Sequence, residues 1–123
     1  MFQESGGKRK TGERYEDQAR KWLEAKNYCI LGQNVNFRGG ELDLIAEERD
    51  GKRTTLVFIE VRKRDSRGYL RPEETITFEK KRRLLRAVQL YLLSYRGRAT
   101  EVRIDLIGFY DEELVHRKDF ISL

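Results

Sequence analysis

Residues 56–62, with the sequence Leu-Val-Phe-Ile-Glu-Val-Arg, decide the fold of this chain. The stretch is apolar at every position until Glu60, and a run that is apolar on both faces predicts a central strand covered on each side by other elements. Because side chains alternate along a strand, Glu60 and Arg62 share one face, whereas Lys63 points the opposite way. The stretch therefore predicts an acidic side chain inside an otherwise buried strand.

A second stretch, Gly-Glu-Leu-Asp-Leu-Ile-Ala at residues 40–46, carries the other notable acids. Alternation places Glu41 and Asp43 on one face of a predicted strand. If this strand pairs with residues 55–63 as a hairpin that turns near residues 50–51, Asp43 and Glu60 lie nearly opposite each other on an antiparallel ladder. The two stretches together predict that these carboxylates meet.

Burying a pair of ionised carboxylates destabilises a fold by about several kcal/mol, unless a nearby cation neutralises the pair or a raised pKa keeps one group protonated. Oxygen ligands without an accompanying cluster of His or Cys favour a hard cation, Mg²⁺ or Mn²⁺, over zinc. The alternative is that acids at strand ends are simply exposed or paired with nearby arginines. The residues by themselves leave both interpretations open.

The length of 123 residues predicts one domain with one core. We expect a flexible N-terminal lead over residues 1–10 and a single domain over residues 11–123. The net charge is +5, and the basic residues concentrate at residues 62–71 and 79–86. A polyanion is the natural partner of such segments, although a basic surface is commonly only solvated.

The single Cys29 lies in an apolar stretch, which predicts a small buried hydrophobic side chain and a reducing compartment. No apolar stretch approaches the roughly 20 residues that cross a bilayer, and the first residues do not resemble a signal peptide. We therefore expect a cytoplasmic protein without a membrane partner.

Apolar periodicity and turn residues predict six elements in an α/β arrangement. They are a helix from Thr11 to about Asn27, strands at 28–35, 41–47 and 55–63, a helix at 77–95 capped by Thr77, and a strand at 102–110. A loop at 64–75 joins the third strand to the second helix. This order predicts a mixed sheet flanked by helices.

The order of elements and the two acidic stretches resemble the YraN family of uncharacterised bacterial proteins. The other positions that carry the resemblance are Gly12, Glu16, residues 28–31, Asn34, Arg38, residues 77–80, residues 103–105 and residues 116–120. The family in turn is similar to the restriction-endonuclease-like PD-(D/E)xK nuclease superfamily and, within it, to the archaeal Holliday-junction resolvases. The resemblance implies a restriction-endonuclease-like αβββαβ core.

Carried over residue by residue, the resemblance makes Asp43 the first acid of the nuclease motif, Glu60 the second, and Arg62 the replacement for the motif lysine. Glu16 matches the additional helical acid of the resolvase-like branch, although an acid early in a helix also stabilises the helix dipole. The implied catalytic residues are these four. The implied ligands of Mg²⁺ or Mn²⁺ are Asp43, Glu60 and the Val61 carbonyl, with Glu16 bound directly or through water.

The resemblance implies a metal-dependent endonuclease or exonuclease that hydrolyses DNA phosphodiester bonds in repair or recombination. Because no groove-reading motif is visible, we expect it to recognise branched, flapped or single-stranded DNA rather than a sequence. Arginine stays protonated, so Arg62 can stabilise charge but is a poor general base. The alternatives are a catalytically weak or inactive nucleic-acid-binding adaptor with the same fold, and an RNA-processing nuclease.

Nucleic-acid contacts are expected from basic and aromatic residues around the acids, with salt-dependent and largely sequence-independent binding. The candidates are Arg38, Lys63, Arg64, Arg67, Tyr69, Lys80 and Lys81. Arg103 and Asp105 share a strand face, where an ordinary ion pair is expected. Since resolvase-like nucleases are often dimers, the resemblance allows a homodimer, and the sequence leaves the oligomeric state open.

Overall fold

The computed structural model describes residues 11–64 and 76–123. Seven elements follow one another in this part of the chain: α1 (Thr11–Ala25), β1 (Tyr28–Phe37), β2 (Gly40–Asp50), β3 (Arg53–Arg64), α2 (Phe78–Ser94), β4 (Glu101–Tyr110) and β5 (Glu113–Ile121). The predicted lead over residues 1–10 and residues 65–75 of the predicted loop lie outside the described residues. The mixed α/β architecture that the sequence predicts is confirmed.

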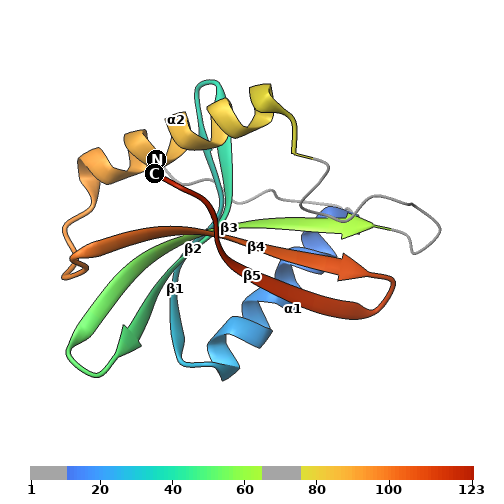
Figure 1. Ribbon diagram of the computed structural model, residues 1–123, viewed down its shortest axis with the longest axis horizontal. Coiled ribbons are helices and arrows are strands. Elements are labelled where there is room, and N and C mark those ends of the chain that lie inside the picture. Colours follow the sequence, from blue (N-terminus) through green and yellow to red (C-terminus); the bar gives the residue numbers. More distant parts are fainter. Residues whose placement is uncertain (1–10, 65–75) are drawn as a thin grey trace.

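The strands form one sheet in the order β1-β2-β3-β4-β5. All neighbours pair antiparallel except β3 and β4, which are parallel and are connected through α2. Figure 1 shows α2 over one face of the sheet and α1 against the other. β3 is the middle strand, as its apolar sequence predicts.

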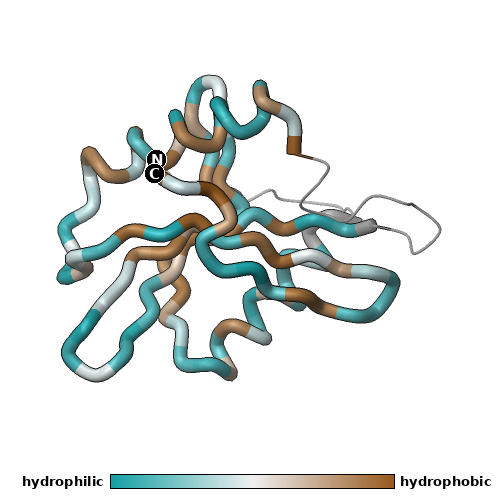
Figure 2. Tube along the Cα trace, viewed as in Figure 1, coloured by the Kyte–Doolittle hydropathy of each residue, from teal (hydrophilic) through white to brown (hydrophobic). Residues whose placement is uncertain are grey.

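Each helix buries an apolar stripe against its own face of the sheet. On α1, the stripe Tyr15, Ala19 and Leu23 recurs every four residues and packs with Leu44 and Ile59. On α2, the corresponding stripe is Leu84, Ala87 and Val88, which packs against apolar residues such as Phe58 and Ile104. Figure 2 shows the apolar segments concentrated in the middle of the sheet and the polar segments at the hairpin ends. Among the described helices, none is long and apolar enough to cross a membrane.

The β5 strand was not predicted from the sequence. A two-residue turn, Asp111 and Glu112, separates it from β4, and Asp111 has a φ of 54°. Most β5 side chains are partly or fully exposed, because β5 is an edge strand. A strand of this kind lacks the regular apolar alternation on which a sequence-based prediction depends.

The prediction of a buried Cys29 was wrong, because the structure exposes this side chain. Cys29 lies on β1, the other edge strand of the sheet, next to Tyr28, which is buried against α1. Alternation therefore turns Cys29 away from the α1 core. The first residues of β1 therefore bury only their α1-facing side chains.

The turn between β1 and β2 packs directly against α2. Gly39 has a φ of +86°, a left-handed conformation that glycine adopts without strain. A Cβ atom at Gly40 would lie 2.7 Å from the Arg83 carbonyl oxygen and 3.1 Å from the Ala87 Cβ. The two glycines thus bring the first residues of β2 close to the first half of α2.

Candidate active site

The two predicted acids meet where the ladder between β2 and β3 ends. The last paired residues are Leu44 and Ile59, and the next residues along the two strands are Asp43 and Glu60. Asp43 Oδ2 accepts a hydrogen bond from the Val61 backbone N–H at 2.9 Å, and Glu60 is close enough for its charge to raise the pKa of Asp43. The prediction that these carboxyl groups lie together is confirmed.

Burial governs the electrostatics of this pair. Burial, the charge of Glu60 and the charge of Glu16 raise the pKa of Asp43 well above its usual value, and the Val61 N–H offsets only part of that shift. Burial also raises the pKa of Glu60, against the opposing effects of Arg62 and of the hydrogen bond from Asp43. With two like charges so close, ionising both groups is costly, and the pair retains a proton more readily than separate carboxylates do.

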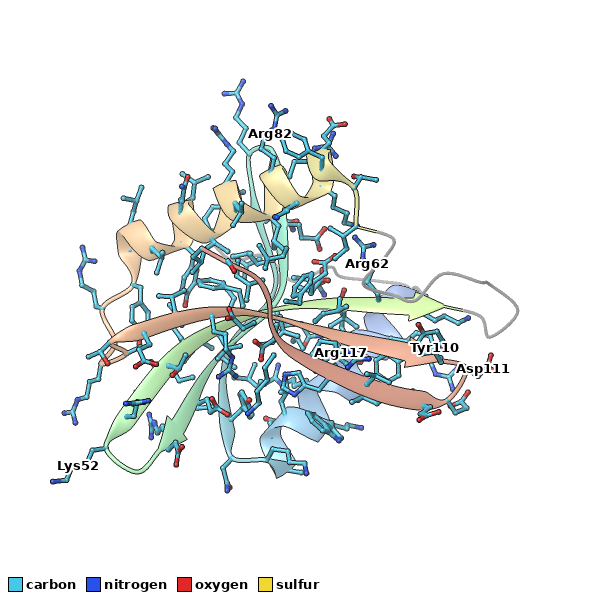
Figure 3. All side chains as sticks on the ribbon, in the orientation of Figure 1. Lys52, Arg62, Arg82, Tyr110, Asp111 and Arg117 are labelled. Carbon is cyan, nitrogen blue, oxygen red and sulfur yellow. The ribbon has the colours of Figure 1, made fainter. Side chains whose placement is uncertain are left out.

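Among the described residues, two cations approach Glu60. Arg62 Nη2 lies 2.8 Å from Glu60 Oε1, and Lys80 Nζ lies 3.7 Å from the same oxygen. The Arg62 side chain is only 17% exposed, and its Nε has no hydrogen-bond acceptor in the described part of the chain. Figure 3 shows Arg62 between the end of β3 and the first half of α2. Arg62 thus neutralises part of the Glu60 charge while one donor remains available for another acceptor.

Glu16 approaches the acids from α1. Its exposed fraction is 9%, and its charge contributes to the raised pKa of Asp43. The sequence-based orientation of Glu16 toward the sheet is therefore confirmed. Its proximity to Asp43 brings a third acid to the same end of the sheet.

A pocket of about 510 Å³ opens over the acid pair, and we call it the acid pocket. Its lining comes from the β1–β2 turn, β2, β3 and α2: Gly39, Gly40, Glu41, Asp43, Glu60, Lys80, Arg83 and Leu84. Burial and the charge of Glu60 raise the pKa of Glu41, which belongs to the rim of this pocket. The sheet contributes carboxylates to this pocket and α2 contributes cations, so the pocket can hold a cation and a phosphate side by side.

Arg83 and the two glycines, Gly39 and Gly40, line the acid pocket but were not predicted as site residues. Arg83 follows Lys80 by three positions, so helical geometry places both side chains on the same side of α2. That spacing was a usable signal for Arg83. The role of Gly40 depends on its contact with the Arg83 carbonyl, which no local sequence pattern reveals.

The other predicted nucleic-acid-binding residues fall into three groups. Lys81 on α2 and Arg38 beside the β1–β2 turn are exposed and stand outside the acid pocket. Lys63 lies on the α1 side, with Nζ 5.4 Å from the centre of the Tyr15 ring, so it does not line this pocket. The side chain of Arg64 and the whole of Arg67 and Tyr69 lie outside the described residues.

The donors at the acid pocket are oxygen atoms, which suit a hard divalent cation. Within residues 11–64 and 76–123, no group of three or more His, Cys, Asp and Glu side chains is arranged to hold a metal ion. Asp43 and Glu60 lie opposite each other beyond the end of the β2–β3 ladder, and both line this pocket. The chemistry of the donors therefore fits Mg²⁺ or Mn²⁺, and a cation would rely on these two carboxylates and on backbone or solvent oxygen.

A separate polar network lies on the α1 side of β4. The fully buried Asp105 binds Arg103 Nε at 2.8 Å, His116 Nε2 at 2.8 Å and the backbone N–H of Asp119 at 2.9 Å. Arg103 also reaches Glu48 at 2.7 Å. The predicted ion pair is confirmed and belongs to a larger buried network. None of these residues lines the acid pocket.

The model of the family described as "Uncharacterised protein family UPF0102" matches residues 15–109 of this chain. A UPF0102 protein of Persephonella marina is 37% identical over 112 residues, which cover 91% of this chain and 93% of that protein. The UPF0102 protein YraN of Escherichia coli O1:K1 / APEC is 40% identical over 113 residues, which cover 90% of this chain and 83% of that protein. The matched residues include Glu16, Asp43 and Glu60. The chain belongs to the UPF0102 family.

Proposed function

We propose that this protein is a metal-dependent nuclease of the PD-(D/E)xK type, similar to archaeal Holliday-junction resolvases, which hydrolyses phosphodiester bonds in DNA. The observation that carries the proposal is the juxtaposition of Asp43 and Glu60 just beyond the end of the β2–β3 ladder, in the lining of a pocket that α2 cations also line. Two adjacent strands thus present paired carboxylates to a space that also contains Lys80 and Arg83. Branched, flapped or single-stranded DNA from repair or recombination is the proposed substrate.

The residues that would hold Mg²⁺ or Mn²⁺ are Asp43, Glu60 and the Val61 carbonyl, with Glu16 in support. A bound divalent ion supplies positive charge that activates water and stabilises the developing charge on a phosphate. The raised pKa values of Asp43 and Glu60 support this role, because a nearby cation favours the ionised form of both groups. The Asp43–Val61 hydrogen bond fixes the carboxyl group before any ion arrives.

The chain's own cations would bind and orient the scissile phosphate. Arg62 has a buried Nε without an acceptor among the described residues, and a phosphate oxygen would satisfy this donor. Lys80 lies beside the same Glu60 oxygen and would add a second positive charge. Arg62 holds its proton throughout, so it would stabilise charge rather than accept a proton.

The ion pair between Arg62 and Glu60 also supports a second candidate function, a nucleic-acid-binding adaptor without turnover. At 2.8 Å, the Arg62 guanidinium neutralises one of the carboxylates that a metal ion would use. In that case the acid pocket would retain the fold of a nuclease site while the cations bind a phosphate backbone. Such a protein would bind DNA equally well with and without a divalent ion.

The experiment that separates these functions incubates the purified protein with linear, flapped and four-way-junction DNA and with single-stranded RNA, under Mg²⁺ or Mn²⁺. The comparison protein is the Asp43→Asn/Glu60→Gln double variant. Metal-dependent cleavage that the double variant loses would support the nuclease and name its substrate. Tight binding without cleavage under both metals would favour the adaptor, and cleavage confined to RNA would assign RNA processing.

A further inference from the structure

A second pocket, of about 660 Å³, lies between the tip of the β2–β3 hairpin and the segment that follows α2, and we call it the hairpin pocket. Its lining contains four cations, Arg49, Lys52, Arg96 and Arg98, together with Glu47, Gly51, Thr54 and Gly97. Figure 3 shows Lys52 at the tip of the hairpin, far from Arg62 and the acid pocket. The hairpin pocket is thus a separate and strongly cationic site.

The one carboxylate in the lining is fixed by other contacts. Glu47 Oε2 accepts a hydrogen bond from the Tyr95 hydroxyl at 2.6 Å, and Arg49 Nη2 lies 3.4 Å from Glu47 Oε1. A Cβ atom at Gly97 would collide with the Tyr95 hydroxyl and lie 2.6 Å from Glu47 Oε2. Glycine at this position therefore leaves room for the hydrogen bond between Tyr95 and Glu47. A single carboxylate neutralises only part of the charge of the four cations in the lining.

Arg49 and Arg96 are only partly neutralised by their contacts, and Lys52 and Arg98 have no acidic partner among the described residues. Arg96 donates from Nη1 to the carbonyl oxygens of Leu93 and Tyr95, which satisfies acceptors at the negative end of α2. Lys52 and Arg98 are exposed, and neither pairs with an acid within the described residues. Positive charge held without a partner around a concave surface favours an anion.

Further cations lie between the hairpin pocket and the acid pocket. Arg82, Arg83 and Arg86 line a third pocket of about 800 Å³ along α2, which shares Gly39 and Arg83 with the acid pocket. Figure 3 shows Arg82 pointing away from the sheet. The 17 residues of α2 span about 25 Å, which is the length of about seven base pairs of duplex DNA. Cations therefore accompany α2 from the acid pocket toward the hairpin pocket.

We propose that the hairpin pocket is a second phosphate-binding site, in which Lys52 and Arg98 hold the backbone of a nucleic acid about seven base pairs from the acid pocket. This inference rests on the proposed function for the nature of the partner. The hairpin pocket would fix the position of the nucleic acid along the protein, and cleavage would take place at the acid pocket. Such a contact binds backbone and carries no sequence information.

The test measures the affinity of the full chain for a duplex of about 20 base pairs at several salt concentrations in EDTA, where no metal-dependent cleavage occurs. The variant is Lys52→Ala/Arg98→Ala, and the matched control is Lys21→Ala/Lys26→Ala, which removes the same charge from one exposed position on α1 and one just after it. Each phosphate contact contributes about 0.9 to the slope of log affinity against log salt. The slope is expected to fall by about 2 in the Lys52/Arg98 variant and to keep its value in the control.

Equal slopes in the two variants would overturn the inference. A second arm adds inorganic phosphate and follows the signals of Lys52 and Arg98 by NMR. Phosphate binding at these residues, with unchanged duplex affinity in the variant, would assign the pocket to a free anion and overturn the nucleic-acid assignment. A lowered slope without any metal-dependent cleavage by the wild type would support the hairpin pocket and contradict the nuclease.

Discussion

Asp43 and Glu60 lie opposite each other immediately beyond Leu44 and Ile59, the last pair of the β2–β3 ladder. The backbone N–H of Val61 donates a hydrogen bond to Asp43 Oδ2 at 2.9 Å. A side chain therefore takes the place of a strand partner at the point where β2 leaves β3. Two buried carboxyl groups held in this way cost stability unless a proton or a cation accompanies them.

Asp43→Asn is expected to raise the free energy of unfolding at neutral pH by about 1 kcal/mol, comparable to one pKa unit. The amide oxygen can still accept from Val61, and the charge is removed. Because the pKa of Asp43 is raised in the folded state, the wild type is most stable at acid pH and loses that contribution as the pH rises through the raised pKa. The advantage of the variant should therefore grow as the pH rises above about 4, the usual pKa of an aspartate.

Urea denaturation across this pH range measures the effect, with Asp50→Asn as the control. Asp50 is an exposed aspartate on the same strand, outside the acid pocket. The control is expected to follow the wild type at every pH. If Asp43→Asn is less stable than the wild type at neutral pH, the claim that repulsion between Asp43 and Glu60 destabilises the fold is contradicted.

Divalent metal is expected to reverse the order of these stabilities. A ligand that binds only the folded state at about 100 times its Kd adds about 2.7 kcal/mol. Mn²⁺ or Mg²⁺ should raise the Tm of the wild type and of Asp50→Asn, and it should leave Asp43→Asn nearly unchanged. Thermal denaturation with and without metal checks this without any substrate. Equal metal-induced shifts in all three proteins would rule out Asp43 as a ligand.

Asp105→Asn is expected to lower the free energy of unfolding by about 3 kcal/mol, since it removes one partner of a buried charge network. Burial alone would raise the pKa of Asp105, but hydrogen bonds from His116, Arg103 and the Asp119 backbone hold it below its usual value. The stabilisation by Asp105 is thus present above about pH 4 and is lost as the pH falls through the lowered pKa.

Chemical denaturation of Asp105→Asn and of the control Glu101→Gln checks this prediction. Glu101 is an exposed acid on the same strand, 3.6 Å from Arg53, so its change should cost less than about 1 kcal/mol. The difference between wild type and Asp105→Asn should shrink in acid. A difference that widens as the pH falls would contradict the assigned direction of the pKa shift.

Arg62→Ala is expected to lower the single-turnover cleavage rate by at least about 100-fold, because it removes the charge nearest to Glu60 that would stabilise the phosphate. Arg62→Lys keeps the positive charge and introduces the lysine of the nuclease motif, so its cleavage rate should stay within about tenfold of the wild-type rate. The control is Lys63→Ala, since Lys63 stands over Tyr15 on the α1 side. Cleavage by Arg62→Ala at the wild-type rate would remove Arg62 from the mechanism.

The central part of the fold could be predicted from sequence because it depends on local pattern. Alternation and apolar length identify β3, and a four-residue period identifies the buried stripe of α1. Thr77 was identified as the cap of α2, and its Oγ1 accepts from the Lys80 N–H at 3.1 Å. The edge strand β5 escaped prediction because half-exposed side chains leave no clear alternation.

The part of the candidate site that depends on the register of two neighbouring strands could be predicted from the sequence. The part that depends on contacts between distant elements could not. The pairing of Asp43 with Glu60 follows from the position of the β2–β3 turn and from alternation. Arg83 and Gly40 join the acid pocket because the β1–β2 turn packs on α2, a contact between elements about 40 residues apart in sequence. The hairpin pocket depends likewise on Gly97 and on the Tyr95–Glu47 hydrogen bond, which connect distant segments.

The most direct test of the central claim is the rate of Mn²⁺-dependent phosphodiester cleavage by the wild type, by Asp43→Asn and by the matched Asp50→Asn control, on the DNA that the wild type cuts best. The account predicts that the wild type and the control cleave at the same rate and that Asp43→Asn loses at least about 100-fold. Equal cleavage by all three proteins, or its absence in a folded and metal-loaded wild type on every substrate, would contradict it.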